Sequence, residues 1–217
     1  MNLESLSLSW VDILVVALLG VGLWRGRKRG MSEECLDIVK WALIVLVCGV
    51  AYQPAGQLLS ETVGFLSPLA WYVTVYILLA IIIAVTFTII RKGPGSKLTG
   101  SDAFGSAEYY LGMVAGMFRY TCIIIVAMSL VNARQYSDAE VKSKVKYQED
   151  NFGTTFFMTL PDIQRAVFTQ SISGRMAREH LSIVLIRPTP AGGTAVAGVD
   201  SVVRARERSG YDLLGQK

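Results

Sequence analysis

The chain has 217 residues, of which 52% are hydrophobic and only 18% are charged, and its formal net charge is +4. A soluble domain has nearer a quarter charged residues, and here the charges gather in the segments between long apolar stretches. This composition excludes an ordinary soluble globular protein. It makes the lipid bilayer the solvent in which most of the chain has to fold.

Four apolar stretches follow one another, each about as long as a helix that crosses a bilayer core, on the order of 20 residues. They are Leu6–Trp24, Cys35–Tyr52, Leu66–Ile90 and Leu111–Val131. Residues 72–90 lack any charged side chain, and a helix that is apolar all round is buried in lipid or in a large core. The sequence therefore predicts an all-α integral membrane protein, with four transmembrane helices in residues 6–131.

Basic residues in the short loops predict the orientation of these helices. Four Lys and Arg residues lie within 25–29, and three more lie within 91–97, whereas the loop between the second and third stretches has none. Short basic loops stay on the cytoplasmic side. The expected topology therefore places both the N-terminus and the C-terminus outside the cytoplasm.

The composition changes at Asn132, where a second region begins. Residues 132–187 start with a charged juxtamembrane connector that can continue the fourth helix. Apolar side chains then recur at near-helical spacing from Asp162 to Leu185. This spacing predicts an amphipathic helix that lies on the membrane surface, against the bundle, or in a short soluble cap. Residues 188–217 are rich in Gly, Ala and Pro and are expected to form a disordered, flexible tail.

Ionisable side chains within the apolar stretches are candidates for function, because an unpaired charge in lipid is costly. Asp37 and Lys40 are three residues apart on one helix, so they can neutralise each other. Asp12 and Arg119 are expected at similar depths in the first and fourth helices. Three interpretations stay open: an ion pair between these two helices, a polar transport path, or an Asp12 that is hydrated at the interface.

Gly112 and Gly116 form a G-x-x-x-G pattern in the fourth helix. Two glycines four residues apart leave a flat face that another helix can approach closely. The pattern predicts a helix-packing site, either inside the protein or between two proteins.

The sequence contains no pattern that indicates catalysis, a cofactor or a metal ion. There is no phosphate-binding loop, no nucleophile elbow and no zinc-protease motif, and His180 is the only histidine. The basic residues of the second region are mixed with acidic ones, which is not typical of nucleic-acid binding. We expect a protein that is not an enzyme, whose partners are lipid and other membrane proteins or a second copy of itself.

Two spaced motifs resemble those of the colicin V production protein (CvpA) family of small bacterial inner-membrane proteins. The first runs from Trp10-Val11-Asp12-Ile13 to Arg29-Gly30 and then to Glu34 and Trp41. The second comprises Leu111-Gly112, Gly116 and Arg119. Two departures are Glu108-Tyr109-Tyr110, where the family has Asp-Arg before Leu-Gly, and Tyr120, where it has glycine.

The resemblance implies an inner-membrane protein that serves toxin production, secretion or maintenance of the envelope. The expected mechanism is packing against membrane partners through the face that contains Gly112 and Gly116. The alternative function is a small transporter or channel, with a polar path through Asp12 and Arg119.

Overall fold

The structure is a computed structural model that describes residues 9–63, 66–92, 105–152 and 159–190. Within these residues, three helical stretches are long and apolar enough to cross a membrane: Trp10–Val63, Pro68–Lys92 and Glu108–Asn132. Residues 6–8 of the first predicted helix, and most of the predicted tail over 188–217, lie outside the described residues.

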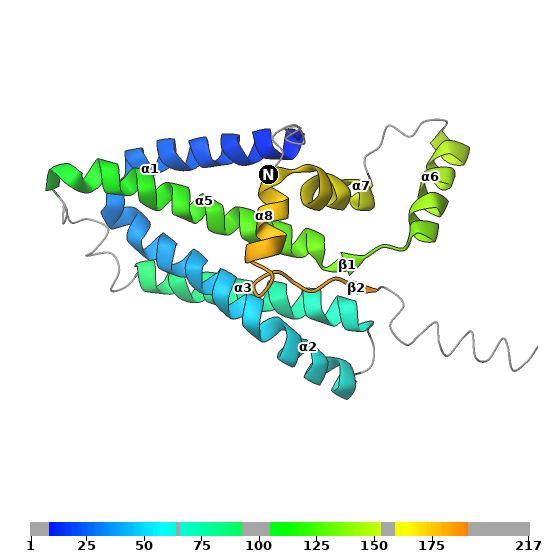
Figure 1. The fold of residues 1–217 in the computed structure, drawn as a ribbon. Coiled ribbons are helices and arrows are strands. Elements are labelled where there is room, and N and C mark those ends of the chain that lie inside the picture. The colour runs from blue at the N-terminus through cyan, green and yellow to red at the C-terminus, as the bar shows by residue number, and fades with distance from the viewer. Residues whose placement is uncertain (1–8, 64–65, 93–104, 153–158, 191–217) are drawn as a thin grey trace, which may run out of the picture.

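The first long stretch consists of two arms. Helix α1 (Trp10–Leu43) contains Gly30, whose φ of 77° and ψ of 170° are not helical. The chain turns back there, so that residues 10–29 and 31–43 form separate arms of α1 (Figure 1). Only glycine adopts such a φ at little cost, so Gly30 determines where the chain turns.

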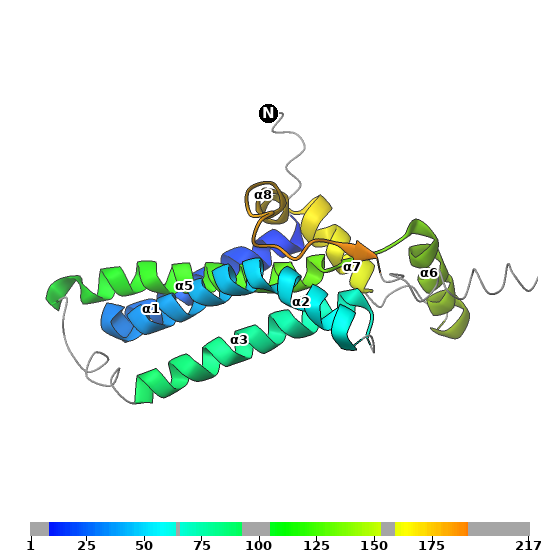
Figure 2. The same ribbon diagram turned by 90° about the horizontal axis from the view of Figure 1, so that it is seen from below.

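The second arm is longer than the sequence predicts. It passes through a π-helical turn, η2 (Ile44–Cys48), into α2 (Gly49–Val63). Helix α3 (Pro68–Lys92) then packs along α2. A short 3-10 helix, η3 (Gly105–Ala107), leads into α5 (Glu108–Asn132), which lies beside the first arm of α1 (Figures 1 and 2).

Glycine lets α1 and α5 approach each other closely. A Cβ atom added to Gly26 would collide with the carbonyl oxygen of Gly112, and one added to Gly116 would collide with that of Gly22. The Gly112 and Gly116 face is therefore an internal packing site. The expectation that this face binds a partner protein is wrong, because the first arm of α1 already covers it.

A cap follows at the end of the bundle where α1 begins (Figure 1). Helix α5 ends at Asn132, and the cap starts with a two-residue strand. Its elements are β1 (Arg134–Gln135), α6 (Asp138–Phe152), α7 (Leu160–Arg165), a π-helical turn η4 (Ala166–Gln170), α8 (Ile172–His180) and β2 (Thr189–Pro190).

The prediction of a single amphipathic helix over 162–185 is wrong, because the helix is interrupted at Ser171. Ser171 has an extended backbone and caps α8: its Oγ accepts a hydrogen bond from the Gly174 amide at 2.9 Å. The same hydroxyl donates to the carbonyl of Val167 at 2.7 Å. Ser171 therefore ends one helix and starts the next.

Apolar contacts bind the cap to the bundle. Val11 of α1 and Met128 of α5 share a buried cluster with Val167, Phe168 and Ala177 of the cap. Ile186 is fully buried in a second cluster that includes Tyr52 and Tyr76 of α2 and α3. The segment that precedes β2 is thus part of the folded core.

Residues 188–190 correct the expected start of the flexible tail. β2 pairs in parallel with β1, with Arg134 opposite Thr189, and the amide of Thr189 donates to the carbonyl of Ala133 at 2.9 Å. Residues 188–190 therefore belong to the fold, because their backbone completes hydrogen bonds at the end of α5.

The glycine contact gives a first prediction. Gly26→Ala should lower the thermal unfolding midpoint of the detergent-purified protein, because the methyl group has to push α1 away from α5; overpacking of this kind costs about 1–3 kcal/mol. Gly20→Ala is the matched control on the same arm, since nothing lies within 4 Å of the added Cβ. Equal midpoints for the two variants would contradict the close helix contact.

Candidate functional site: a buried charge network and two capped helices

Arg119 lies at the centre of a buried network of charged side chains. Although α5 is largely apolar, this arginine is only 5% exposed. Its Nη1 atom donates to the two carboxylate oxygens of Glu34 at 2.9 and 2.7 Å and to Oδ2 of Asp37 at 3.2 Å. Arg119 therefore joins α5 to the second arm of α1.

Both carboxylates come from the start of the second arm. Glu34 and Asp37 are one helical turn apart, so their side chains share a face of the helix. Glu34 is completely buried and Asp37 is 7% exposed. Buried charges are tolerated only when they are paired. Arg119 on α5 pairs with both carboxylates, and further cations pair with them as well.

Three further cations surround the carboxylates. Lys40 donates to Oδ1 of Asp37 at 2.7 Å, which confirms the pair predicted from their spacing. Arg29 lies 3.5 Å from both carboxylates, and Arg91 of α3 lies 3.7 Å from Asp37. Four cations thus share two carboxylates. The network links both arms of α1 to α3 and α5.

Arg119 has a buried donor without a partner. Its Nε atom is buried and has no hydrogen-bond partner within the described residues. Its guanidinium also lies 5.2 Å from the ring centre of Tyr120, within reach of a cation–π contact. The cation is held firmly, but by fewer hydrogen bonds than a guanidinium can make.

Glu108 caps the second arm from across the bundle. Its carboxylate accepts hydrogen bonds from the amide of Ser32 at 2.6 Å and from the Ser32 hydroxyl at 3.1 Å. The first amides of a helix have no partner within the helix, and a negative charge there is favourable. Because Glu108 also contacts Gly30, a larger residue at Gly30 would collide with it.

Asp12 performs the same function at the other end of the bundle. It accepts from its own N-cap residue, Ser9, at 3.2 Å, which completes a capping box. It also accepts from the amides of Ile172 and Ser173, at 3.2 and 3.0 Å, and from the Ser173 hydroxyl at 2.7 Å. One carboxylate therefore caps α1 and α8 together.

The predicted ion pair between Asp12 and Arg119 is wrong. Asp12 is satisfied by hydrogen bonds from α8, whereas Arg119 pairs with Glu34 and Asp37 nearer the Gly30 turn. The interpretation of Asp12 as a hydrated interfacial group also fails, because this residue is only 7% exposed.

The residues of the first family-like motif, Arg29, Gly30, Glu34 and Trp41, have different roles in the structure. Arg29 and Glu34 belong to the charge network and Gly30 makes the turn, whereas Trp41 packs against the cluster of α2 and α3. Sequence reasoning missed Glu34 as the partner of Arg119 because the second apolar stretch seemed to begin at Cys35. The signal that could have identified Glu34 is Arg119 itself, because an arginine within an apolar helix needs a carboxylate partner.

The network gives a second prediction. Arg119→Met should sharply reduce the amount of folded protein in membranes, because breaking a buried ion pair leaves charge unpaired, at a cost of about 3–5 kcal/mol. Replacing Glu34 in the same variant with methionine should recover part of the loss, since it removes the unpaired charge. The exposed Arg27, changed to Gln, is the control.

Membrane fractionation, followed by size-exclusion chromatography of the extracted protein, would measure the folded amount. An Arg119→Met variant as abundant and monodisperse as the Arg27→Gln control would show that the network does not hold the bundle together.

Comparison with protein families places this arrangement in a known group. The family model described as Colicin V production protein matches residues 11–147, which include Asp12, Glu34, Glu108 and Arg119. Comparison with curated proteins gave no match, and comparison with solved structures gave none either. Since the family match covers most of the chain, including the three long apolar helices, the protein belongs to the colicin V production protein family.

Proposed function

We propose that this protein is a non-enzymatic factor of the bacterial inner membrane that serves toxin production, secretion or maintenance of the envelope. The observation that carries the proposal is the buried charge network: Arg119 pairs with both Glu34 and Asp37 inside the bundle, and Arg29, Lys40 and Arg91 add further positive charge around these two carboxylates. Such a network holds helices in register and uses its charges for structure, which suits a scaffold better than a carrier.

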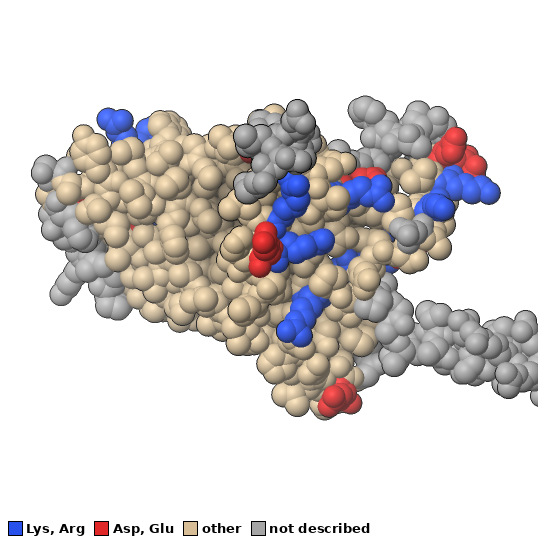
Figure 3. Space-filling view, in the orientation of Figure 1, with Lys and Arg blue, Asp and Glu red and all other residues tan. Residues whose placement is uncertain are grey.

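The scaffold presents apolar helix faces to its surroundings. Figure 3 shows few charged side chains over the long helices and many over the cap. Helix α3 exposes Ile77, Leu78, Ile81, Val85 and Ile89. We propose that lipid covers most of these exposed apolar faces. Other inner-membrane proteins, or a second copy of the chain, pack against part of them, because the Gly112 and Gly116 face is already covered by α1.

The proposed topology has four crossings, with the cap outside the cytoplasm. The first arm of α1, residues 10–29, is about 30 Å long at 1.5 Å per residue, which matches the hydrocarbon core of a bilayer. The Gly30 turn, next to the basic residues 25–29, lies inside the cell in this topology. The start of α1 and the cap lie together at the opposite end (Figure 1).

The topology gives a third prediction. A protease added to intact spheroplasts should cut the cap, because the cap is exposed outside the inner membrane. The loop between α3 and α5 should be cut only after lysis. The reverse pattern, detected with antibodies to either end of the chain, would contradict the proposed orientation.

A fourth prediction separates a scaffold from a carrier. The Asp12→Asn variant is expressed in cells whose own chromosomal gene for this protein has been deleted. It should reduce toxin export or detergent resistance, and the amount of the protein in the membrane should fall in the same proportion. The reason is that the amide loses the negative charge at the start of α8. Glu179→Gln, at an exposed position of α8, should behave as wild type.

Two measurements are compared for each variant: the amount of protein in the membrane and the phenotype. Loss of the phenotype at wild-type abundance, together with ion or solute flux in liposomes that Asp12→Asn abolishes, would favour the transporter instead.

A further inference from the structure

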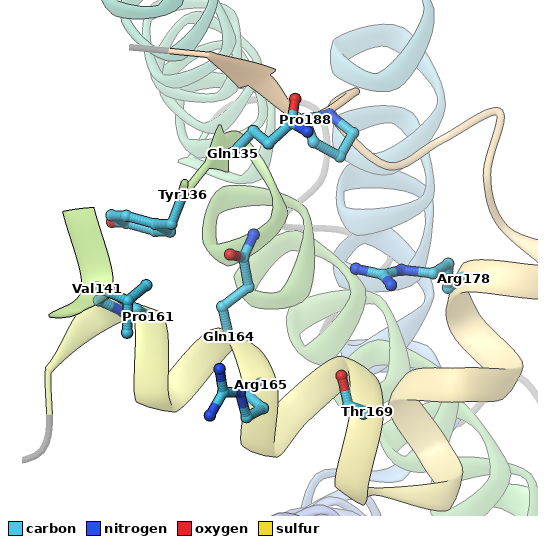
Figure 4. A pocket seen from close by; sticks show the side chains of 9 residues that line it. All are labelled: Gln135, Tyr136, Val141, Pro161, Gln164, Arg165, Thr169, Arg178 and Pro188. Atoms are coloured by element: carbon cyan, nitrogen blue, oxygen red, sulfur yellow. The ribbon is translucent and has the colours of Figure 1, made fainter. Parts of the chain in front are cut away.

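A polar pocket opens on the surface of the cap, outside the charge network, and its lining residues Arg165, Thr169 and Arg178 are exposed. Its volume is about 470 Å³, within the range of small-molecule sites. Residues from β1, α6, α7, η4 and α8 surround it (Figure 4). They are Gln135, Tyr136, Val141, Pro161, Gln164, Arg165, Thr169, Arg178 and Pro188.

The pocket is positive. Arg165 and Arg178 line it, and none of the nine lining residues is acidic. Neither arginine makes an ion pair within the described residues. Arg178 has only a long hydrogen bond to Asn132, at 3.5 Å, and a contact with the Phe168 ring. Two guanidinium groups without a carboxylate are suited to bind an oxyanion, because each offers several N–H donors.

Other cations strengthen the positive character. Arg134 and Lys144 lie 4.8 and 4.9 Å from the centre of the Tyr136 ring. Both of these cations pair with Glu140, which does not line the pocket. They add positive charge beside the pocket, and Glu140 pairs with them rather than with Arg165 or Arg178.

Two lining side chains, Tyr136 and Thr169, carry hydroxyl groups. The Tyr136 hydroxyl is buried and has no hydrogen-bond partner within the described residues. Burial raises the pKa of Tyr136, and its hydroxyl points away from Arg165 and Arg178 (Figure 4), so the Tyr136 ring forms one side of the pocket and its hydroxyl does not contact a ligand there. Thr169, which is exposed, offers its hydroxyl to the pocket. Gln164 lines the pocket but is not available as a donor to a ligand, because its amide nitrogen already donates to the carbonyls of Val131 and Arg134.

The position of the pocket narrows the choice of ligand. Helix α5 ends at Asn132, and the pocket begins three residues later with Gln135. Charged side chains gather over the cap, next to the apolar bundle (Figure 3). If α5 crosses the bilayer, the pocket lies at the level of the lipid head groups, where anionic phosphates are concentrated and basic residues attract them.

We infer that this pocket binds the phosphate of an anionic phospholipid head group through Arg165 and Arg178, with Thr169 as a further hydrogen-bond donor. The inference depends on the membrane placement of the long helices but not on a role in toxin production. It therefore stands or fails separately from the proposed function.

Native mass spectrometry of the purified full chain tests this inference. The protein in neutral detergent is titrated with short-chain phosphatidylglycerol and, separately, with phosphatidylcholine. Each arginine near a lipid phosphate is worth roughly 1 kcal/mol, so Arg165→Gln together with Arg178→Gln should weaken phosphatidylglycerol binding on the order of thirtyfold. Wild type should prefer phosphatidylglycerol to phosphatidylcholine.

Matched variants control for folding and for general charge. Arg175→Gln removes an exposed arginine of α8 that does not line the pocket, and it should leave the affinity within about twofold of wild type. Thr169→Glu places a negative charge at an exposed lining position, so it should weaken binding even if the double variant folds poorly.

Three results would overturn the inference. The first is equal affinity for the two lipids. The second is unchanged phosphatidylglycerol binding in both the double variant and Thr169→Glu. The third is complete displacement of the lipid by an equal concentration of inorganic phosphate or glycerol phosphate, because that would assign the site to a free phosphate.

Discussion

A guanidinium buried among apolar helices has to find carboxylates, and this constraint organises the bundle. Arg119 is fixed on α5, so the second arm of α1 has to bring Glu34 and Asp37 to the same depth. That requirement sets how the two arms align once the chain has turned at Gly30. Lys40, Arg29 and Arg91 then add their charges to the same two carboxylates, so that α3 is also linked to the network.

Charge pairing works together with close backbone contact. The glycines of α1 and α5 allow the two helices to touch along Gly22, Gly26, Gly112 and Gly116. In lipid, apolar side chains gain little from contact with one another, and small residues with good packing become the main source of helix association. The glycine contact supplies proximity, and the Arg119 network supplies the register.

Both ends of the bundle use a carboxylate from one helix to cap another. Glu108 caps the second arm of α1 next to the turn, and Asp12 caps α8 in the cap. In each case an acidic residue in the first turn of one helix lies against the free amides of a second helix. An aspartate near the start of a span can therefore have a structural role that explains its position without invoking transport. This role also ties the cap to the bundle, so the cap carries its pocket at a fixed place beside the ends of α1 and α5.

The sequence by itself determined the membrane character of the protein, its long apolar helices, the Asp37 and Lys40 pair and the family. These features follow from composition, from hydrophobic run length and from spacing within one helix, all of which are local along the chain. The partners of Arg119 and Asp12, the turn at Gly30, the internal use of Gly112 and the break at Ser171 were decided only by the tertiary structure. The physical reason is that each depends on residues more than 70 positions apart, or on a backbone angle or cap, and chain periodicity does not encode which helix faces which.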